Sequence, residues 1–568
     1  MVIVGAAPNA TTVPLGKIDI DAKNSFDGHM LYLPLFAMAA ASVSVQSGRG
    51  VISAGHPLTA ESGAAMLRQG GNAFDAAVAA AFTACITESI LTSLAGGGFL
   101  LAHTAEGENR LFDFFCQTPR HKVPADQVQF FPIQANFGDT VQEFHIGLGS
   151  VAVPGTLAGL LTVHEQLGRL PLKTLLAPAQ HWATQGITVN GFQAYCYQLL
   201  ASILTATDAA RAIYAPQGRL LKEGDRFGLP DFAAFLDQIA QDGSALMYQG
   251  SLADQIIQAS TSQGGYLRME DLQQYQVIER QPLAIPYRDA LLITNPPPSS
   301  GGALIAFALE LLATANLSGH GSPRHVATLR EVMHLTNLAR QDGYDAHLYR
   351  ADVLEEFLGS QHLAPYRQQL MDALGSAACN KWGSTTHISV IDGEGNAVSM
   401  TTSNGEGSAY VIPGTGVMLN NMLGEEDLNP NGFHQWQPNQ RISSMMAPTM
   451  VLEQGKPRLV LGSGGSNRIR TAILQVVSNM LDFGMDIEAA VTAPRIHWER
   501  GSFHLEPGYD REILTQQRIG VEDDCTWWQS PNMFFGGVHA VGRSEDGTFS
   551  GIGDARRSGA CVVVNQGR

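Results

Sequence analysis

KWGSTTHISVIDGEGNAVSMTTS, residues 381–403, alternates apolar and polar residues on both sides of a Gly-rich turn. This period of two predicts a β-hairpin with strands over 387–392 and 397–403. The first strand is preceded by the small residue Ser384 and by two hydroxyl residues, Thr385 and Thr386. His387 alternates onto the strand face opposite to Thr386, so we expect a structural role for it.

The composition indicates a globular protein and excludes one class of partner. Of the 568 residues, 45% are hydrophobic and 15% are charged, which is typical of a compact fold rather than a disordered one. The 52 acidic residues outnumber the 35 basic ones and no basic run is present, so we expect no nucleic-acid partner. The six cysteines are scattered without CxxC or Cys/His spacing, so we interpret them as mostly buried thiols. The sequence shows no metal-ligand constellation, and we expect no cofactor.

An apolar run, MLYLPLFAMAAASVSV over 30–45, precedes the first clear strand signal near residue 50. It resembles a signal-peptide core, but Asp and His precede it instead of Lys or Arg. It is also short for a membrane span. We interpret residues 1–49 as a leader or poorly ordered N-terminal segment, expect no membrane span, and slightly favour the cytoplasm over the periplasm or secretion.

The order of predicted elements places strands at both ends of the chain. Two helices are expected first, with Thr59 capping residues 60–69 and Asn72 capping residues 73–89. A Gly turn then leads into a strand hairpin, the pattern is mainly helical from about 155 to 345, and short strands dominate after 385. This order suggests sheets assembled from both ends of the chain.

A threonine at the start of a strand can act as a nucleophile if it is the first residue of a chain. Its own α-amino group, which titrates near ~7.7–8.0, then serves as the base. An internal Thr385 would become N-terminal if its hydroxyl attacked the carbonyl of Ser384 and water opened the resulting ester. The small Ser384 leaves room for that attack. Other nucleophile patterns are missing: no G-x-S-x-G elbow occurs, and the Gly-rich segment 462–468 has no P-loop Lys.

Several further motifs occur in the order typical of γ-glutamyltransferases, and the chain resembles that family from about residue 50 to its end. The motifs are GGNAFDAAVAA (70–80), LAGGGFL (94–100), SVAVPGTLAGL (150–160), PPPSSGG (296–302), STTHISVID (384–392), PGTGVMLNN (413–421), SSMMAPTMV (443–451), GSGGSNRI (462–469) and APRIHWE (493–499). The resemblance implies the N-terminal nucleophile hydrolase fold, an α+β four-layer αββα sandwich. It also implies a proenzyme that cleaves itself into a heavy chain, 50–384 after the leader, and a light chain, 385–568.

The resemblance also implies roles for individual residues. Thr385 would be the nucleophile that cleaves a γ-glutamyl or related amide and passes the acyl group to water or an amine. Ser403 takes the place of a Thr that hydrogen-bonds the nucleophile. Gly464 and Gly465 would offer backbone N–H groups to the oxyanion. Ser443 and Ser444 fall where paired serines hold the substrate carboxylate.

The glutamate-binding positions depart from the family pattern. The usual D-x-R-E reads DFFC over 113–116, so Phe115 replaces the Arg that grips the α-carboxylate. Met422 and Glu425 stand where glutathione-active members carry Gln and then Asp, the latter binding the α-amine. Gly405 replaces an Asn. A buried carboxylate without a bidentate Arg partner is poorly bound, which puts glutathione itself in doubt.

Two alternatives to a γ-glutamyltransferase-like enzyme of glutathione metabolism therefore stay open. One is an acylase on the same scaffold that acts on a non-glutamyl amide such as a β-lactam side chain, and Phe115 and Met422 favour it. The other is an uncleaved, non-catalytic binding protein. For the enzyme we expect a heavy–light heterodimer that can assemble further, with small-molecule partners only. Near the C-terminus, the charged segment 554–560 is interpreted as a salt-bridged turn from which Asp554 or an Arg could reach the pocket rim.

Overall fold

The computed structural model describes residues 43–46, 48–136, 141–315, 317, 319–372, 385–429, 432–520 and 522–565. Most of the predicted leader, residues 1–42, and Ser384 lie outside the described residues.

The predicted hairpin lies at the middle of a seven-stranded antiparallel sheet, called here the first sheet. The first strand of the hairpin, β12, pairs with β2 from the N-terminal part of the chain and with β13, the second strand of the hairpin. The order across the sheet is β21 (Ala560–Asn565), β2 (Gly48–Ala54), β12 (Thr386–Asp392), β13 (Ala397–Ser403), β3 (Gly97–His103), β4 (Asn109–Asp113) and β9 (Ile278–Arg280).

A second seven-stranded antiparallel sheet packs face to face on the first, with β15 and β19 against β12. Its order is β1 (Val43–Gln46), β20 (Thr548–Ile552), β19 (Gly537–Arg543), β15 (Lys456–Gly464), β14 (Thr449–Glu453), β11 (Ala290–Thr294) and β10 (Leu283–Tyr287). Both sheets thus combine strands from the two ends of the chain, as the element order predicted.

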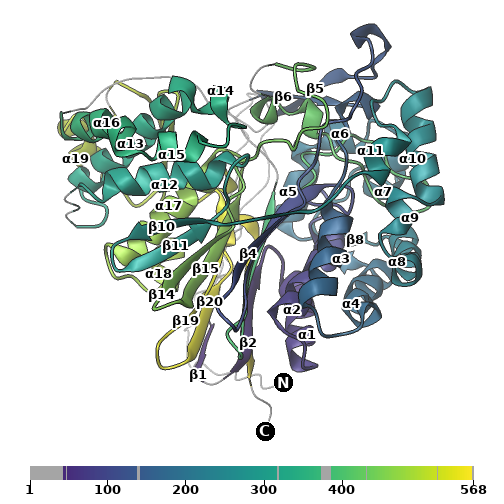
Figure 1. Ribbon diagram of the computed structural model, residues 1–568, viewed down its shortest axis with the longest axis horizontal. Coiled ribbons are helices and arrows are strands. Elements are labelled where there is room, and N and C mark those ends of the chain that lie inside the picture. The colour runs from purple at the N-terminus through teal and green to yellow at the C-terminus, as the bar shows by residue number, and fades with distance from the viewer. Residues whose placement is uncertain are drawn as a thin grey trace, which may run out of the picture. The chain divides into compact units, whose positions relative to one another are not determined.

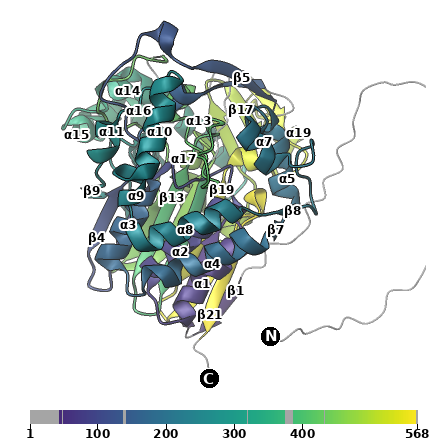
Figure 2. The same ribbon diagram turned by 90° about the vertical axis from the view of Figure 1, so that its right-hand side faces the viewer.

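Helices cover the outer face of each sheet, which confirms the predicted αββα sandwich (Figure 1). The first sheet is covered by α1 (Pro57–Arg68), α2 (Ala73–Thr87) and α3 (Thr156–Leu167). Over them, α4 (Leu172–Gln185) packs mainly on α2, and α8 (Pro230–Asp242) packs on α4 (Figure 2). The second sheet is covered by α12 (Ser300–Leu312), α17 (Arg468–Leu481) and α18 (Ile487–Thr492), with α13 (Pro323–Ala339) and α16 (Ser360–Asp372) against α12.

The rest of the described chain forms further α-helices and three small sheets. The remaining helices are α5 (Gly191–Leu199), α6 (Ala201–Leu204), α7 (Asp208–Tyr214), α9 (Ala245–Tyr248), α10 (Ser251–Ser262), α11 (Met269–Gln273), α14 (Asp345–His347), α15 (Val353–Phe357) and α19 (Arg511–Gln516). The remaining strands are β5 (Phe131–Asn136), β6 (Val141–Ile146), β7 (Ile187–Thr188), β8 (Arg226–Phe227), β16 (Ile496–Glu499), β17 (Ser502–Leu505) and β18 (Asp524–Trp527).

The first two helices have different N-terminal caps. Asn72 and Asp75 form a capping box at the start of α2, so the predicted cap is confirmed. The predicted cap of α1 is wrong: the side chain of His56 accepts the Leu58 N–H, and Pro57 occupies the first helical position. Thr59 lies inside the helix, where its hydroxyl makes tertiary contacts instead.

A polar layer of small side chains and histidines lies between the two sheets. His387 is buried there, 2.8 Å from the Thr401 hydroxyl through Nδ1 and 2.9 Å from the Ser389 hydroxyl through Nε2. Burial, and then the neighbouring His539, lower the pKa of His387 well below its usual value, so the ring is neutral. Its face of the strand is opposite to that of Thr386, as predicted.

We predict that Gly462→Ala destabilises the sandwich by about 1–3 kcal/mol, the usual cost of overpacking a well-packed core. A Cβ at position 462 would lie 2.3 Å from the His387 ring, which its two hydroxyl partners hold in place. Thermal unfolding would measure the loss. Gly191→Ala is the matched control, because its Cβ meets only ordinary contacts from 3.4 Å outwards. Equal midpoints for both variants would contradict the prediction.

Candidate active site

A small cavity lies where β12 begins and β13 ends, and its volume is about 30 Å³. It brings together Thr385, Ser403, Phe115, Met422, Glu425 and Ser444, which come from segments far apart in the sequence. Its other lining residues are Asp427, Leu428, Met445, Met446, Ser466 and Ile469. Most of the predicted site residues therefore meet at one place.

Thr385 is the residue immediately before β12 and is only 5% exposed. The pairing of Thr386 with Thr402 continues the register so that Thr385 comes opposite Ser403. The carbonyl oxygen of Thr385 accepts a hydrogen bond from Nη1 of Arg557 at 3.2 Å. Burial lowers the pKa of Arg557 to about 10, which still leaves the guanidinium charged at neutral pH. One Arg of the C-terminal segment thus contacts the nucleophile candidate, although it does not line the cavity.

The Gly464–Gly465 turn packs directly against the nucleophile candidate. A Cβ on Gly464 would lie 2.1 Å from the Thr385 carbonyl oxygen, so only glycine fits there. Gly465 has a φ of +122°, which a side chain would disfavour. The predicted oxyanion turn is therefore placed beside Thr385 by the end of β15.

Glu88 lies beneath the start of β12 and was missed by the sequence reasoning. Its carboxylate accepts hydrogen bonds from the Thr386 hydroxyl and, at 3.1 Å, from the Thr59 hydroxyl. Burial raises the pKa of Glu88 to about 7, although these hydroxyls and the Arg557 charge act in the opposite direction. Its one sequence signal is an acidic residue that follows the Ala-rich apolar run 73–87.

The opposite wall of the cavity is acidic. The Glu425 Oε1 atom is buried without a hydrogen-bond partner among the described residues. Burial first, and then Glu406 and Asp427, raise the pKa of Glu425 well above its usual value. A Cβ at Gly405 would lie 2.2 Å from that same oxygen, so the Glu425 carboxyl fills the space of an Asn at position 405.

The position expected for the carboxylate-binding Arg is apolar. Phe115 is buried and stacks on Phe99, with ring centroids 5.3 Å apart. The neighbouring Asp113 instead pairs with Arg280 at 2.8 Å, and Arg441 donates to the Phe115 carbonyl oxygen. Cys116 is buried but does not line the cavity.

Of the two serines predicted to bind the substrate carboxylate, only one lines the cavity. Ser444 lines the cavity, and its hydroxyl accepts the Met446 N–H at 3.1 Å. Ser443 does not line it, and its hydroxyl lies 3.4 Å from that of Ser300.

The predicted salt-bridged turn near the C-terminus is confirmed. Asp554 pairs with Arg495 at 2.7 Å and Arg556 with Glu506 at 2.5 Å. This buried network holds the short helical turn that carries Arg557.

In this protein two stacked sheets lie between helical layers, and a threonine immediately precedes a central strand. This arrangement is typical of the class of N-terminal nucleophile hydrolases. The family model described as gamma-glutamyltranspeptidase matches residues 59–564. The chain belongs to the gamma-glutamyltranspeptidase family, a family of enzymes.

Curated relatives and a solved structure agree with this assignment. A glutathione hydrolase proenzyme of Bacillus subtilis is 30% identical over 91% of this chain and 92% of its own length. An acylase ACY 1 proenzyme of Pseudomonas sp. strain V22 is 31% identical over 91% of this chain and 94% of its own length. The crystal structure of cephalosporin acylase from Bacillus halodurans superposes with a TM-score of 0.81 at 25% identity, covering 94% of this chain and 99% of that one.

No helix in the described ranges is long and apolar enough to cross a bilayer. No group of three or more His, Cys, Asp or Glu side chains in the same ranges could hold a metal ion.

We predict that Glu425→Gln stabilises the folded protein at alkaline pH. The raised pKa means that the folded state binds this proton more tightly than the unfolded chain, so the wild type loses stability as the pH rises from the ordinary carboxyl pKa through the folded one. The neutral glutamine removes this loss. Thermal unfolding at about pH 5 and about pH 8 should therefore show a smaller difference for the variant than for the wild type. The exposed neighbour Glu426→Gln is the control, and an unchanged difference in Glu425→Gln would contradict the prediction.

Proposed function

We propose that the protein cleaves itself before Thr385 and then uses Thr385 for acyl transfer from an amide. The observation that carries the proposal is the position of Thr385, against the glycine turn and at the wall of a cavity. The two curated relatives, both named as proenzymes, support it.

In self-cleavage, the Thr385 hydroxyl attacks the Ser384 carbonyl carbon and the C–N bond of that peptide breaks. The nitrogen takes up the proton and becomes the α-amine of Thr385, while residue 384 is held as an ester. Water then hydrolyses the ester and restores the hydroxyl. The products are residues 1–384 and 385–568. They stay associated because β12 of the second product pairs with β2 of the first.

In turnover, the free α-amine accepts the hydroxyl proton as Thr385 attacks the carbonyl carbon of the donor amide. Backbone N–H groups at Gly464 and Gly465 stabilise the oxyanion, an effect typically worth about 2.7–4 kcal/mol per donor. Collapse expels the amine of the donor and leaves an acyl ester on Thr385. Water or a second amine then takes the acyl group. Ser403, opposite Thr385, supports the nucleophile.

A γ-glutamyl amide is the main candidate donor. The name of the Bacillus subtilis relative supports this choice, and Glu425 lines the cavity where a substrate amine would bind. Ser444, with Ser443 behind it, is the candidate for carboxylate binding.

An acylase is the second candidate, and the apolar wall made by Phe115 and Met422 favours it. The name of the Pseudomonas relative is consistent with it. A donor whose acyl end lacks a carboxylate, such as a β-lactam side chain, would not need the missing Arg.

We predict that the purified wild type yields two fragments and that Thr385→Ala remains one chain, because only the hydroxyl can attack the Ser384 carbonyl. Intact mass spectrometry after incubation at neutral pH measures both. Thr548→Ala, a strand threonine in β20, is the control and should be cleaved like the wild type. An uncut wild-type chain would overturn the mechanism and favour the binding-protein alternative.

Donor choice separates the two enzymatic candidates. We predict turnover of a γ-glutamyl p-nitroanilide, with kcat/KM above that of a phenylacetyl p-nitroanilide. The reverse order from a cleaved enzyme would assign it as an acylase. Release of p-nitroaniline gives both values, with Thr385→Ala as the blank.

A further inference from the structure

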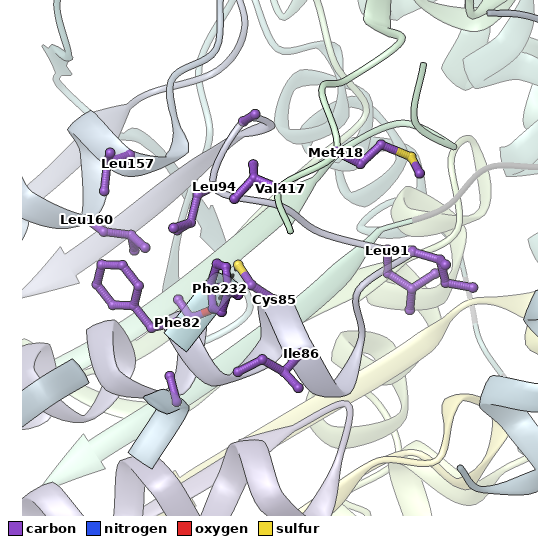
Figure 3. Packing of buried hydrophobic residues seen from close by; sticks show 14 of the residues in the cluster. Phe82, Cys85, Ile86, Leu91, Leu94, Leu157, Leu160, Phe232, Val417 and Met418 are labelled. Carbon is purple, nitrogen blue, oxygen red and sulfur yellow. Dashed lines mark hydrogen bonds between the residues drawn. The ribbon is translucent and has the colours of Figure 1, made fainter. Parts of the chain in front are cut away.

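Glu88 is a buried carboxylate that has no role in the reaction proposed above. It follows α2, every residue of which is buried, and is itself only 5% exposed. Ile86, Leu91 and Leu94, which lie close to Glu88 in the sequence, belong to the hydrophobic core (Figure 3). A carboxylate in such surroundings is costly and needs strong partners.

The partners of Glu88 lead to the nucleophile. One carboxylate oxygen accepts from the Thr386 hydroxyl and the other from the Thr59 hydroxyl, which lies 2.7 Å from that of Thr87. Thr386 is bonded covalently to Thr385. Arg557 holds the other side of this segment through the Thr385 carbonyl oxygen. The backbone that carries the nucleophile is thus held by the Glu88 carboxylate on one side and by the Arg557 guanidinium on the other.

The space around the contact is filled. A Cβ at Gly55 would lie 2.1 Å from Glu88 Oε2 and 3.0 Å from the Thr386 hydroxyl oxygen. The glycine therefore lets the carboxylate approach Thr386, and no other side chain fits between β2 and this contact.

We propose that Glu88 is a positioning residue for the proposed reaction: through the Thr386 hydroxyl it sets the orientation of Thr385 for both self-cleavage and acyl transfer. This inference rests on the proposed function of Thr385. Glu88 itself touches neither the cavity nor a reacting atom.

The ionised carboxylate is the form that fits these contacts, because both hydroxyls donate to it. Protonation would make one oxygen a donor and would remove one of the two acceptor positions. The charged or titratable groups that face Glu88 are Arg557 and the buried thiol of Cys85. With the pKa of Glu88 raised to about 7, acidification weakens the contact near neutral pH. Protonation of Glu88 and protonation of the Thr385 amine would therefore both lower the rate as the pH falls.

Glu88→Gln, Thr386→Val and the double variant test this role. We expect each single variant to slow self-cleavage and to lower kcat about 10-fold or more, because small misplacements of a reacting group cost up to about 100-fold. KM should stay within about twofold, since substrate contacts are unchanged. The double variant should be no slower than either single variant, because both act through one contact.

Stability and pH provide readouts that a purely structural role would not give. Glu88→Gln removes a buried charge, so it should unfold at alkaline pH no more easily than the wild type. On the acid side of the pH profile, kcat of Glu88→Gln should depend on one ionisation, that of the Thr385 amine. The kcat of the wild type should depend on two, those of the Thr385 amine and of Glu88. Thr83→Val, which removes a buried hydroxyl of α2 that donates to the Ala79 carbonyl, is the control and should match the wild type in rate.

Three outcomes would overturn the inference. Glu88→Gln could cleave and turn over like the wild type, it could lose rate only in proportion to lost folded protein, or the double variant could show the product of the two single defects. If Glu88→Gln fails to fold, Thr386→Val provides the same test. A cleavage rate and an acid-side pH dependence of kcat equal to those of the wild type would then overturn the inference. Failure of the wild type to cleave would refute the proposed function instead, so the two failures are distinguishable.

Discussion

The close approach of Gly464 to the Thr385 carbonyl is the contact on which the site depends. It requires that β15 of the second sheet ends where β12 of the first begins, which the face-to-face packing of the two sheets provides. The nucleophile candidate is therefore positioned by backbone rather than by flexible side chains. Arg557 strengthens this arrangement by holding the same carbonyl oxygen. Such rigid placement is what an acyl-transfer site needs, because its cost is met during folding and not during the reaction.

Buried charge divides the site into two regions with different chemistry. Glu88 and Arg557 lie on the side of the nucleophile and have partners there. Across the cavity, Glu425 is accompanied by other acids and by the apolar Phe115. The first region holds Thr385 and lies beside the glycine turn, whereas the second contains the positions that depart from the family pattern. The family assignment therefore supports the proposed acyl transfer at Thr385, whereas the choice of donor depends on the second region.

The hairpin over 387–403 and the strands at both chain ends could be predicted because they carry clear periodicity, whereas the αββα layering was implied only by the resemblance to γ-glutamyltransferases. The gathering of Thr385, Ser403 and Gly464 followed from motif order. Glu88 could not be placed, since it meets Thr386 across 298 residues of sequence and no local pattern marks that contact. Thr59 was misassigned as a cap for the same reason: its hydroxyl is used in a tertiary contact.

The most direct test of the account is to trap the acyl-enzyme and locate the acyl group. After brief reaction with a γ-glutamyl or other N-acyl anilide and quenching in acid, trypsin would cut after Lys381 and release the peptide that contains the nucleophile. The account predicts a peptide that begins at Thr385 and carries the acyl mass on that residue. A peptide that begins at Trp382, or an acyl group on any other residue, would contradict it.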